Sequence, residues 1–153
     1  MKLLFALVAV LRSGTDVFFE KTSLSSQGMV VQLGHSGARC PNPSPTPTEF
    51  IVVDLNGIHY VYVRFCDCGF FSDSNPRRTQ LLRVGWYPAT PEKPASAITF
   101  DALRFFHVHT WQAKTSFYDF FQTLARRIDN SGVSDHPVSF LFESIFTRDD
   151  VSM

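Results

Sequence analysis

The sequence has no excess charge of either sign and no long hydrophobic run. Fourteen lysines and arginines balance fourteen aspartates and glutamates, so net charge alone gives no reason to expect a polyanion binder. No apolar run reaches the roughly 18 residues that a membrane-spanning helix needs. Of the 153 residues, 18% are charged and 44% are hydrophobic, which excludes a disordered or fibrous chain. We therefore expect one small soluble domain that makes no membrane contact.

Cysteine is scarce, whereas phenylalanine is abundant. Three cysteines cannot form a closed disulfide framework, because an odd number leaves one thiol unpaired. Sixteen phenylalanines supply enough ring surface to fill a core. The sequence therefore predicts a domain held by an aromatic core rather than by disulfides.

Motifs of catalysis are missing as well. The chain has no glycine-rich phosphate loop, no H-E-x-x-H and no G-x-S-x-G. No spacing singles out a two-metal carboxylate trio among Asp54, Asp67, Asp73, Asp101 and Asp119. A Cys–His nucleophile pair would use residues that make a better closed metal set. We expect a protein that is not an enzyme and has no small-molecule substrate, with a nuclease-like enzyme as the weaker alternative.

Residues 1–17 form an apolar leader. Lys2 precedes nine apolar residues over 3–11, as at the start of a secretory signal. Arg12 interrupts the stretch, and no A-x-A-like pair of small residues follows it. Residues 1–13 could thus export a small secreted protein, and the alternative is a segment packed on the core.

The clearest local pattern is a hairpin. Two β-rich runs over 50–55 and 58–65 flank Asn56-Gly57, which predicts a type I′ turn with Asp54 opposite His59. Residues 29–33 predict another strand, and 22–28 a short capped helix that ends at a glycine. Prolines at alternate positions over 41–47 predict a polyproline-like connector. Further prolines predict loops over 76–82 and 85–94.

Two helices are predicted near the C-terminal end. Thr99 caps the first, over 100–109, and Ser116 with Asp119 opens the second, over 116–129. The second helix carries one apolar stripe, which predicts a core face: Phe117, Phe120, Phe121, Leu124 and Ile128. The predicted fold class is α+β, a small antiparallel sheet centred on the Asn-Gly hairpin and packed against two Phe-rich helices.

Charge is unevenly distributed along the chain. Residues 76–114 hold six basic against two acidic residues, and residues 129–153 hold five acidic residues against one arginine. A basic middle could guide a polyanion to one face. Two separate solvated surfaces explain the same blocks equally simply.

The chain concentrates its metal-ligating residues in two short segments. His35-x4-Cys40 lies on a loop rich in glycine and proline, and Cys66-x-Cys68 ends the second hairpin strand. Residues two apart on a strand point to the same face, so both thiolates can reach one ion. Three sulfurs and one imidazole are a set that zinc takes in closed structural sites. Reduced cysteines in an aromatic core are the alternative, and the spacing alone does not decide between them.

Other histidines fit such a site less well. His59 lies an odd number of residues from Cys66 and Cys68, so on an unbroken strand it faces the opposite side. His107 and His109 diverge on a helix, and His136 precedes a proline in the tail. Geometry therefore favours His35 as the fourth ligand.

These residues also carry a family resemblance. The ordered matches are F-F-E-K-T-S-L (18–24), Q-L-G-H-S-G-A-R-C-P (32–41), D-L-N-G-I-H (54–59), F-C-D-C (65–68), T-Q-L-L-R-V-G-W-Y-P-A-T (79–90), I-T-F-D-A-L (98–103) and S-F-Y-D-F-F (116–121). Over about 18–130, the chain resembles the CxC-type cysteine-cluster domain associated with KDZ transposases of mushroom-forming fungi. The resemblance implies a zinc-chelating module N-terminal to an RNase-H-like transposase domain. It places the C-x-C of that family on Cys66 and Cys68, and its L-G-H…C-P element on His35 and Cys40.

The chain departs from that family at both ends. Family members have further cysteines upstream and a C-P-x-C-P segment downstream, where this chain has the leader and a divergent acidic tail over 133–153. We expect a cysteine-cluster domain over 18–132 that is truncated, a fragment, a relic copy or a repurposed module without the transposase catalytic domain.

The function implied by the resemblance is that of a transposon-derived accessory module. Structural Zn²⁺ is expected on His35, Cys40, Cys66 and Cys68. The module would contact DNA, through Arg77, Arg78 and Arg83, or a transposase or other partner protein, and would lie in the nucleus or elsewhere inside the cell. The alternatives are a structural or protein-interaction domain without a DNA role and the small secreted protein.

Overall fold

A computed structural model describes residues 13–14, 19–20, 23–35, 38–46, 48–69 and 76–128. Apart from Ser13–Gly14, the predicted leader over 1–17 lies outside the described residues, as does the tail over 133–153. Two short strands, β1 (Ser13–Gly14) and β2 (Phe19–Glu20), pair with each other in antiparallel fashion. Every other described strand belongs to one sheet.

The sequence predicts a purely antiparallel sheet, but the observed sheet is mixed. Its order is β3 (Val30–Gln32), β6 (Gly57–Cys66), β5 (Phe50–Asp54), β8 (Ser96–Thr99) and β7 (Trp86–Pro88). The pairs β3–β6 and β5–β8 are parallel, whereas β5–β6 and β7–β8 are antiparallel. Parallel neighbours need long crossover connections. The connection from β3 to β6 contains β4 and β5, and the connection from β5 to β8 contains β6, α1 and β7. A local sequence pattern cannot reveal such pairings.

The β5–β6 hairpin is present, but its register differs from the prediction. Asp54 pairs with Gly57 and Val52 with His59, so the turn passes through Leu55 and Asn56. Asn56 has no positive φ in this turn, whereas Gly57 has φ 142°. The type I′ turn predicted at Asn56-Gly57 requires φ > 0 at both residues, and this condition is not met. The register shift is two residues, so each side chain keeps the face that the sequence assigned to it.

The proline-rich segment contains a strand instead of a connector. Residues Pro43–Pro45 form β4, which pairs antiparallel with the C-terminal end of β6. The Thr46 amide donates to the Val63 carbonyl, and the Asp67 amide donates to the Asn42 carbonyl. Even-numbered residues therefore make the ladder bonds, and the prolines fall at positions whose nitrogens face away from β6. Alternating prolines are compatible with a strand that has only one partner.

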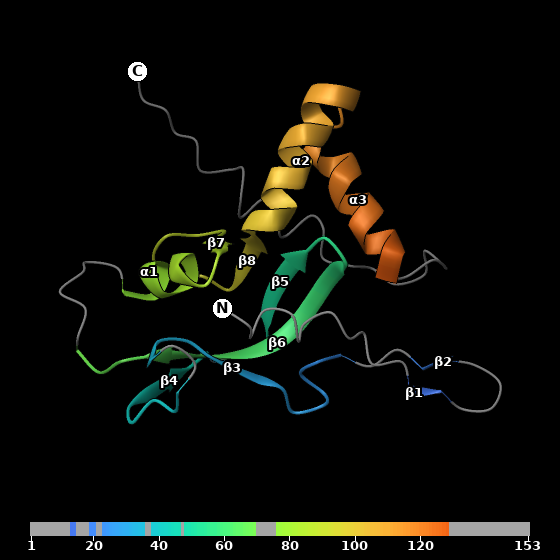
Figure 1. Cartoon of the computed structure of the whole chain (residues 1–153). Coiled ribbons are helices and arrows are strands. Elements are labelled where there is room, and N and C mark those ends of the chain that lie inside the picture. Colours follow the sequence, from blue (N-terminus) through green and yellow to red (C-terminus); the bar gives the residue numbers. More distant parts are fainter. Residues whose placement is uncertain are drawn as a thin grey trace, which may run out of the picture.

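Helices cover both faces of the sheet. The predicted helix over 100–109 is α2 (Phe100–Ala113), and the predicted helix over 116–129 is α3 (Phe117–Ile128). In Figure 1 these two helices form a hairpin that rises above β5 and β6. A third helix, α1 (Pro76–Arg83), lies beside β7 where the sequence predicts a loop. Pro76 is the first residue of α1, a position where proline favours a helix because its missing N–H is not needed.

The core consists of two clusters. Val52 and Val53 are adjacent on β5 and wholly buried, yet they belong to different clusters because successive strand residues point to opposite faces. The first cluster includes Leu81 of α1 and Trp86, and the second includes Phe120 and Phe121 of α3. The described part of the predicted Phe stripe is thus a core face.

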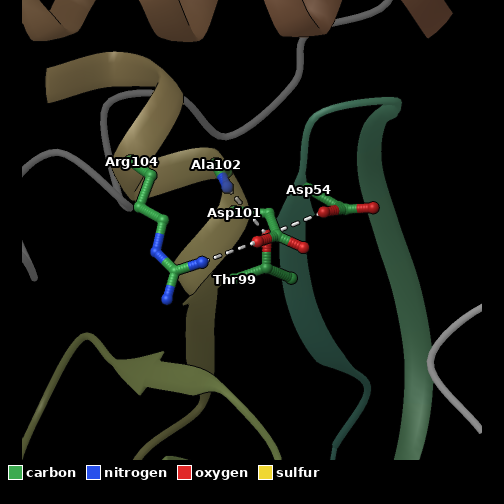
Figure 2. A network of polar contacts seen from close by, with 5 residues as sticks. All are labelled: Asp54, Thr99, Asp101, Ala102 and Arg104. Carbon is green, nitrogen blue, oxygen red and sulfur yellow. Dashed lines mark hydrogen bonds and ion pairs between the residues drawn. The ribbon is translucent and has the colours of Figure 1, made fainter. Parts of the chain in front are cut away.

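The start of α2 is tied to the β5–β6 hairpin by a short polar network (Figure 2). Thr99 Oγ1 accepts a hydrogen bond from the Ala102 amide at 3.2 Å and donates one to Asp54 Oδ1 at 2.7 Å. Asp101 and Arg104 form an exposed ion pair at 3.7 Å within the first turns of α2. The predicted cap at Thr99 is confirmed, and Asp54 has a structural role here.

Candidate metal centre

Four predicted ligands come together from three places in the fold. His35 follows β3 after a glycine, and Cys40 lies on the loop that enters β4. Cys66 is the last residue of β6, and Cys68 lies two residues beyond it. Their ligand atoms all lie within 4.8 Å of one another. The described ranges contain no other cluster of three or more His, Cys, Asp or Glu residues with metal-ligand spacing.

The distances fit a tetrahedral ion. His35 Nε2 lies 3.2 Å from Cys66 Sγ and 3.4 Å from Cys68 Sγ, and Cys40 Sγ lies 3.4 Å from Cys68 Sγ. Zinc–sulfur bonds of about 2.3 Å at tetrahedral angles separate two sulfurs by about 3.8 Å. Each of these three distances lies within a few tenths of an ångström of the separation that such an ion requires. Three thiols and one imidazole also match the donor chemistry of zinc.

The cluster is partly buried in the domain, with two of its four side chains buried and one exposed. Cys40 and Cys66 are 4% and 5% exposed, Cys68 is half-buried and His35 is exposed. An ion bound here would be coordinated by four side chains, which is typical of a structural site rather than a catalytic one.

The loop before His35 makes a close approach to β6. Gly34 has φ 79° and His35 has φ 49°, so two successive residues adopt the left-handed region. A Cβ atom at position 34 would lie 2.7 Å from Cys66 Cβ. Glycine is therefore needed here both for its backbone conformation and for its lack of a side chain. This turn brings the His35 imidazole over the two thiols of the C-x-C segment.

Hydrogen bonds shift the pKa values of the Cys40 and Cys68 thiols in opposite directions. Burial raises the pKa of Cys40, but hydrogen bonds from the Cys68 thiol and from the backbone amides of Asn42 and Asp67 outweigh it and lower that pKa overall. Burial, together with the hydrogen bonds to Cys40 and Cys66, raises the pKa of Cys68 to about 11. Cys40 thus ionises before Cys68, and the charge of Cys40 opposes ionisation of Cys68. A bound cation removes this opposition and favours thiolates at every position.

The remaining histidines lie elsewhere. His59 is 6% exposed on the opposite face of β6, and its Nε2 lies 3.5 Å from Asn56 Oδ1. Burial lowers the pKa of His59 even though the Asp54 carboxylate raises it. His107 and His109 lie on α2, outside the cluster, and His136 lies outside the described residues. The odd spacing from Cys66 correctly separates His59 from the site.

Sequence reasoning missed two residues that support the cluster. The Asn42 side chain donates to the Asp67 carbonyl at 2.9 Å and joins the Cys40 loop to the C-x-C segment. Gln80 of α1 makes two hydrogen bonds to the backbone of Cys66. No sequence signal points to Gln80, because the prolines around it predict a loop rather than a helix.

The three arginines predicted as phosphate contacts all lie on α1. At 3.6 residues per turn they are spaced about 100–140° apart around the helix axis. The guanidinium of Arg77 lies 5.3 Å from the centre of the Phe65 ring and within 3.5 Å of Ser44 Oγ, so this side chain is engaged within the domain. Arg78 and Arg83 are exposed.

The fold and the cluster together define an α+β domain in which one His and three Cys from three segments form a group that could hold a metal ion. The family model described as "CxC2 like cysteine cluster associated with KDZ transposases" matches residues 24–132, and the chain belongs to this family. No curated protein and no solved structure matches the chain significantly. Among the described residues, none of the helices is both long enough and apolar enough to span a membrane.

Proposed function

We propose that this chain is a non-catalytic, zinc-stabilised accessory module derived from a KDZ-type transposase. The observation that carries the proposal is the convergence of His35, Cys40, Cys66 and Cys68 to within 4.8 Å. When bound, zinc supplies apparent binding energy on the order of 10–16 kcal/mol in small domains, which is comparable to the whole stability of a domain. The ligands would hold the β3 loop, the β4 loop and the end of β6 together.

The metal content of the purified chain tests this proposal directly. We expect one zinc per chain in protein prepared without added metal. Cys40→Ser and Cys66→Ser should each reduce the zinc content to near zero, because three remaining ligands leave the site open. His59→Gln is the control, since His59 is buried on the other face of β6, and it should keep its zinc. A wild-type chain that contains no metal and gains no stability from added zinc would refute the proposal.

We further propose that the module contacts DNA through α1. Support comes from the association of its family with KDZ transposases and from the exposure of the basic residues Arg78 and Arg83. Binding to duplex DNA should weaken steeply with salt, so that log K plotted against log salt concentration has a steep negative slope. Each lost phosphate contact should make this slope shallower by about 0.9. Arg78→Gln and Arg83→Gln should each make it shallower. Arg104→Gln on α2 is the control that should leave it unchanged. A DNA-binding module of this family would act in the nucleus.

Contact with a partner protein is the second candidate, and one observation favours it. Phe105, Val108 and Trp111 of α2 are 45%, 55% and 77% exposed, and helical spacing places them on one side of the helix. Exposed apolar groups of this kind are typical of protein contacts. A chain that shows no salt-dependent DNA binding, but whose complex with a transposase is lost in Trp111→Ser, would support this alternative. The Arg78→Gln variant should keep that complex.

A further inference from the structure

Gln80 is a buried polar residue with a specific pair of partners. Its side chain is 2% exposed, and it lies on α1 beside the fully buried Leu81. Gln80 Oε1 accepts a hydrogen bond from the Cys66 amide at 2.7 Å, and Gln80 Nε2 donates one to the Cys66 carbonyl at 2.8 Å. Both backbone groups of a proposed metal ligand are therefore satisfied by one side chain.

The position of Cys66 explains why these hydrogen bonds are needed. The backbone of Arg64 bonds toward β3, since its carbonyl accepts from the Leu33 amide at 2.9 Å. Cys66, two residues further along β6, faces the same side. There β3 has already ended, because the chain turns through Gly34 to bring His35 over the thiols. Without Gln80, the amide and carbonyl of Cys66 would be buried with no strand beside them.

The amide of Gln80 thus replaces the missing strand residue. A primary amide offers one acceptor and one donor side by side, the same pair that a neighbouring strand presents to a peptide group. The two hydrogen bonds fix the backbone of Cys66 and with it the direction of its Cα–Cβ bond. Cys66 Sγ then lies 3.2 Å from His35 Nε2, and the same turn brings Gly34 against Cys66 Cβ.

We propose that Gln80 is a positioning residue of the metal centre, which it controls by orienting Cys66. This inference rests on the proposed zinc function, because it assigns a role toward the same site. A purely structural role would give a different result. Loss of a buried hydrogen bond anywhere in the domain lowers stability, whereas loss of ligand orientation also changes the metal complex in molecules that remain folded.

The test compares two buried polar residues at different distances from the site. Gln80→Met keeps the length of the side chain and removes both hydrogen bonds to Cys66. Thr99→Val removes a buried cap hydrogen bond at the start of α2, far from the cluster in sequence and in the sheet. Both variants are loaded with Co²⁺ or Zn²⁺ and studied at a temperature at which they are folded by circular dichroism. The readouts are the visible absorption of bound Co²⁺ and the affinity for Zn²⁺ in competition with a chelator.

We expect Gln80→Met to bind Zn²⁺ about 10–100-fold more weakly, the usual effect of losing a group that orients a ligand. Its Co²⁺ spectrum should change in band position or intensity. Thr99→Val should lose stability but keep the wild-type spectrum and affinity. If Gln80→Met does not fold, Gln80→Leu is used instead, because it removes the same two hydrogen bonds without burying a charge, and it should show a similar loss of affinity.

The outcomes separate the inference from the proposed function. A wild-type chain that binds neither ion refutes the zinc site itself and the role of Gln80 with it. A wild-type chain that binds zinc, together with a Gln80 variant of unchanged affinity and spectrum, overturns the inference alone. Equal losses of zinc affinity in the Gln80 and Thr99 variants would also overturn it, since the effect would then follow global stability.

Discussion

Two adjacent residues in the left-handed backbone region direct the imidazole of the cluster. Histidine adopts this region more readily than most residues that carry a Cβ, so His35 with φ 49° costs little. Gly34 is under a stricter constraint, because even a methyl group there would meet Cys66 Cβ at 2.7 Å. The geometry of the four clustered side chains thus depends on a residue that is not one of them.

Gly34→Ala should therefore abolish tight zinc binding. Gly28→Ala is a matched control, because Gly28 has a similar φ of 74° but nothing within 4 Å of the point that an added methyl group would occupy. Both substitutions should cost about 1–2 kcal/mol from the left-handed backbone. Only the change at position 34 should also displace the β3 loop from Cys66. Zinc content and urea unfolding of the two variants measure this, and equal behaviour would contradict the steric argument.

His59 should make the domain sensitive to mild acid. Burial lowers the pKa of His59 from its usual 6.5, so the folded chain keeps this imidazole neutral while the unfolded chain protonates it. Its contribution to stability is thus complete above about pH 6.5 and is lost as the pH falls from there through the lowered pKa. The Asp54 carboxylate favours protonation of His59 and so opposes this effect, and Asn56 Oδ1 lies 3.5 Å from the imidazole. Unfolding below pH 6.5 should take up no more than one proton at this residue.

The measurement compares wild type with His59→Gln, both saturated with zinc, by urea unfolding above and below about pH 6.5. Acid also releases thiolate-bound metal, and this loss is common to both proteins. We expect the difference in the free energy of unfolding to move in favour of the variant as the pH falls. A difference that is independent of pH would mean that His59 has the same pKa in the folded and the unfolded chain, which would contradict the prediction.

At the scale of elements, β4 shows how a proline-rich segment can still be a strand. Its prolines occupy positions that make no ladder bond to β6, and Ser44 occupies a bonded position opposite Phe65. The strand holds the Cys40 loop against the end of β6. Its register therefore influences the metal centre as well as the sheet.

Ser44→Pro should break this pairing. The substitution removes an amide and leaves the Phe65 carbonyl without its donor, at a cost of about 1–3 kcal/mol, and it should weaken zinc binding by loosening the Cys40 loop. Pro45→Ala is the control and should cost less than about 1 kcal/mol, through the greater freedom of the unfolded chain. Thermal unfolding and zinc affinity report the two effects. A Ser44→Pro variant with unchanged zinc affinity would show that β4 does not hold Cys40.

Local patterns predict the elements whose signals are local. The caps at Thr99 and Ser116 indicate α2 and α3, and hydrogen bonds at both residues are present. Helix α1 is not predicted because its three arginines and the proline at its first position leave no clear apolar periodicity. In the fold, Gln80 and Leu81 of this helix are buried against the sheet. The hairpin turn lies one residue before the predicted Asn-Gly pair, and the pairing of β5 with β6 is shifted by two residues as a result. Parallel pairing of β3 with β6 has no local signal.

At the scale of the whole molecule, the convergence of His35, Cys40, Cys66 and Cys68 could be predicted because the chain has three cysteines and one suitably placed histidine. The period of the strand decides which histidine faces the thiols, and the change of register does not affect this reasoning because His59 and Cys66 lie on the same strand, β6. The supporting groups could not be predicted in the same way. Asn42 and Gln80 act through backbone groups of residues distant in sequence, and only the folded chain brings them together.

The two core clusters differ in their relation to the cysteine–histidine centre. The first contains Leu33, Phe65 and Leu81, which lie beside the ligands or beside Gln80 along the chain. The second joins the hairpin and β8 to α2 and α3 and contains no neighbour of a ligand. Loss of the metal should therefore weaken one side of the domain more than the other.

Hydrogen exchange before and after treatment with a chelator tests this asymmetry. Amides of β3, β4, α1 and the last residues of β6 should lose protection after metal removal, because the three segments then lose the ion that joins them. Amides of β8 and α2 should keep most of theirs, since the second cluster buries Ile98, Ala102 and Phe121 without help from the centre. A Cys66→Ser chain should give the same pattern without a chelator. Uniform loss of protection would instead make the domain a single cooperative unit, as in small zinc fingers that are unfolded without metal.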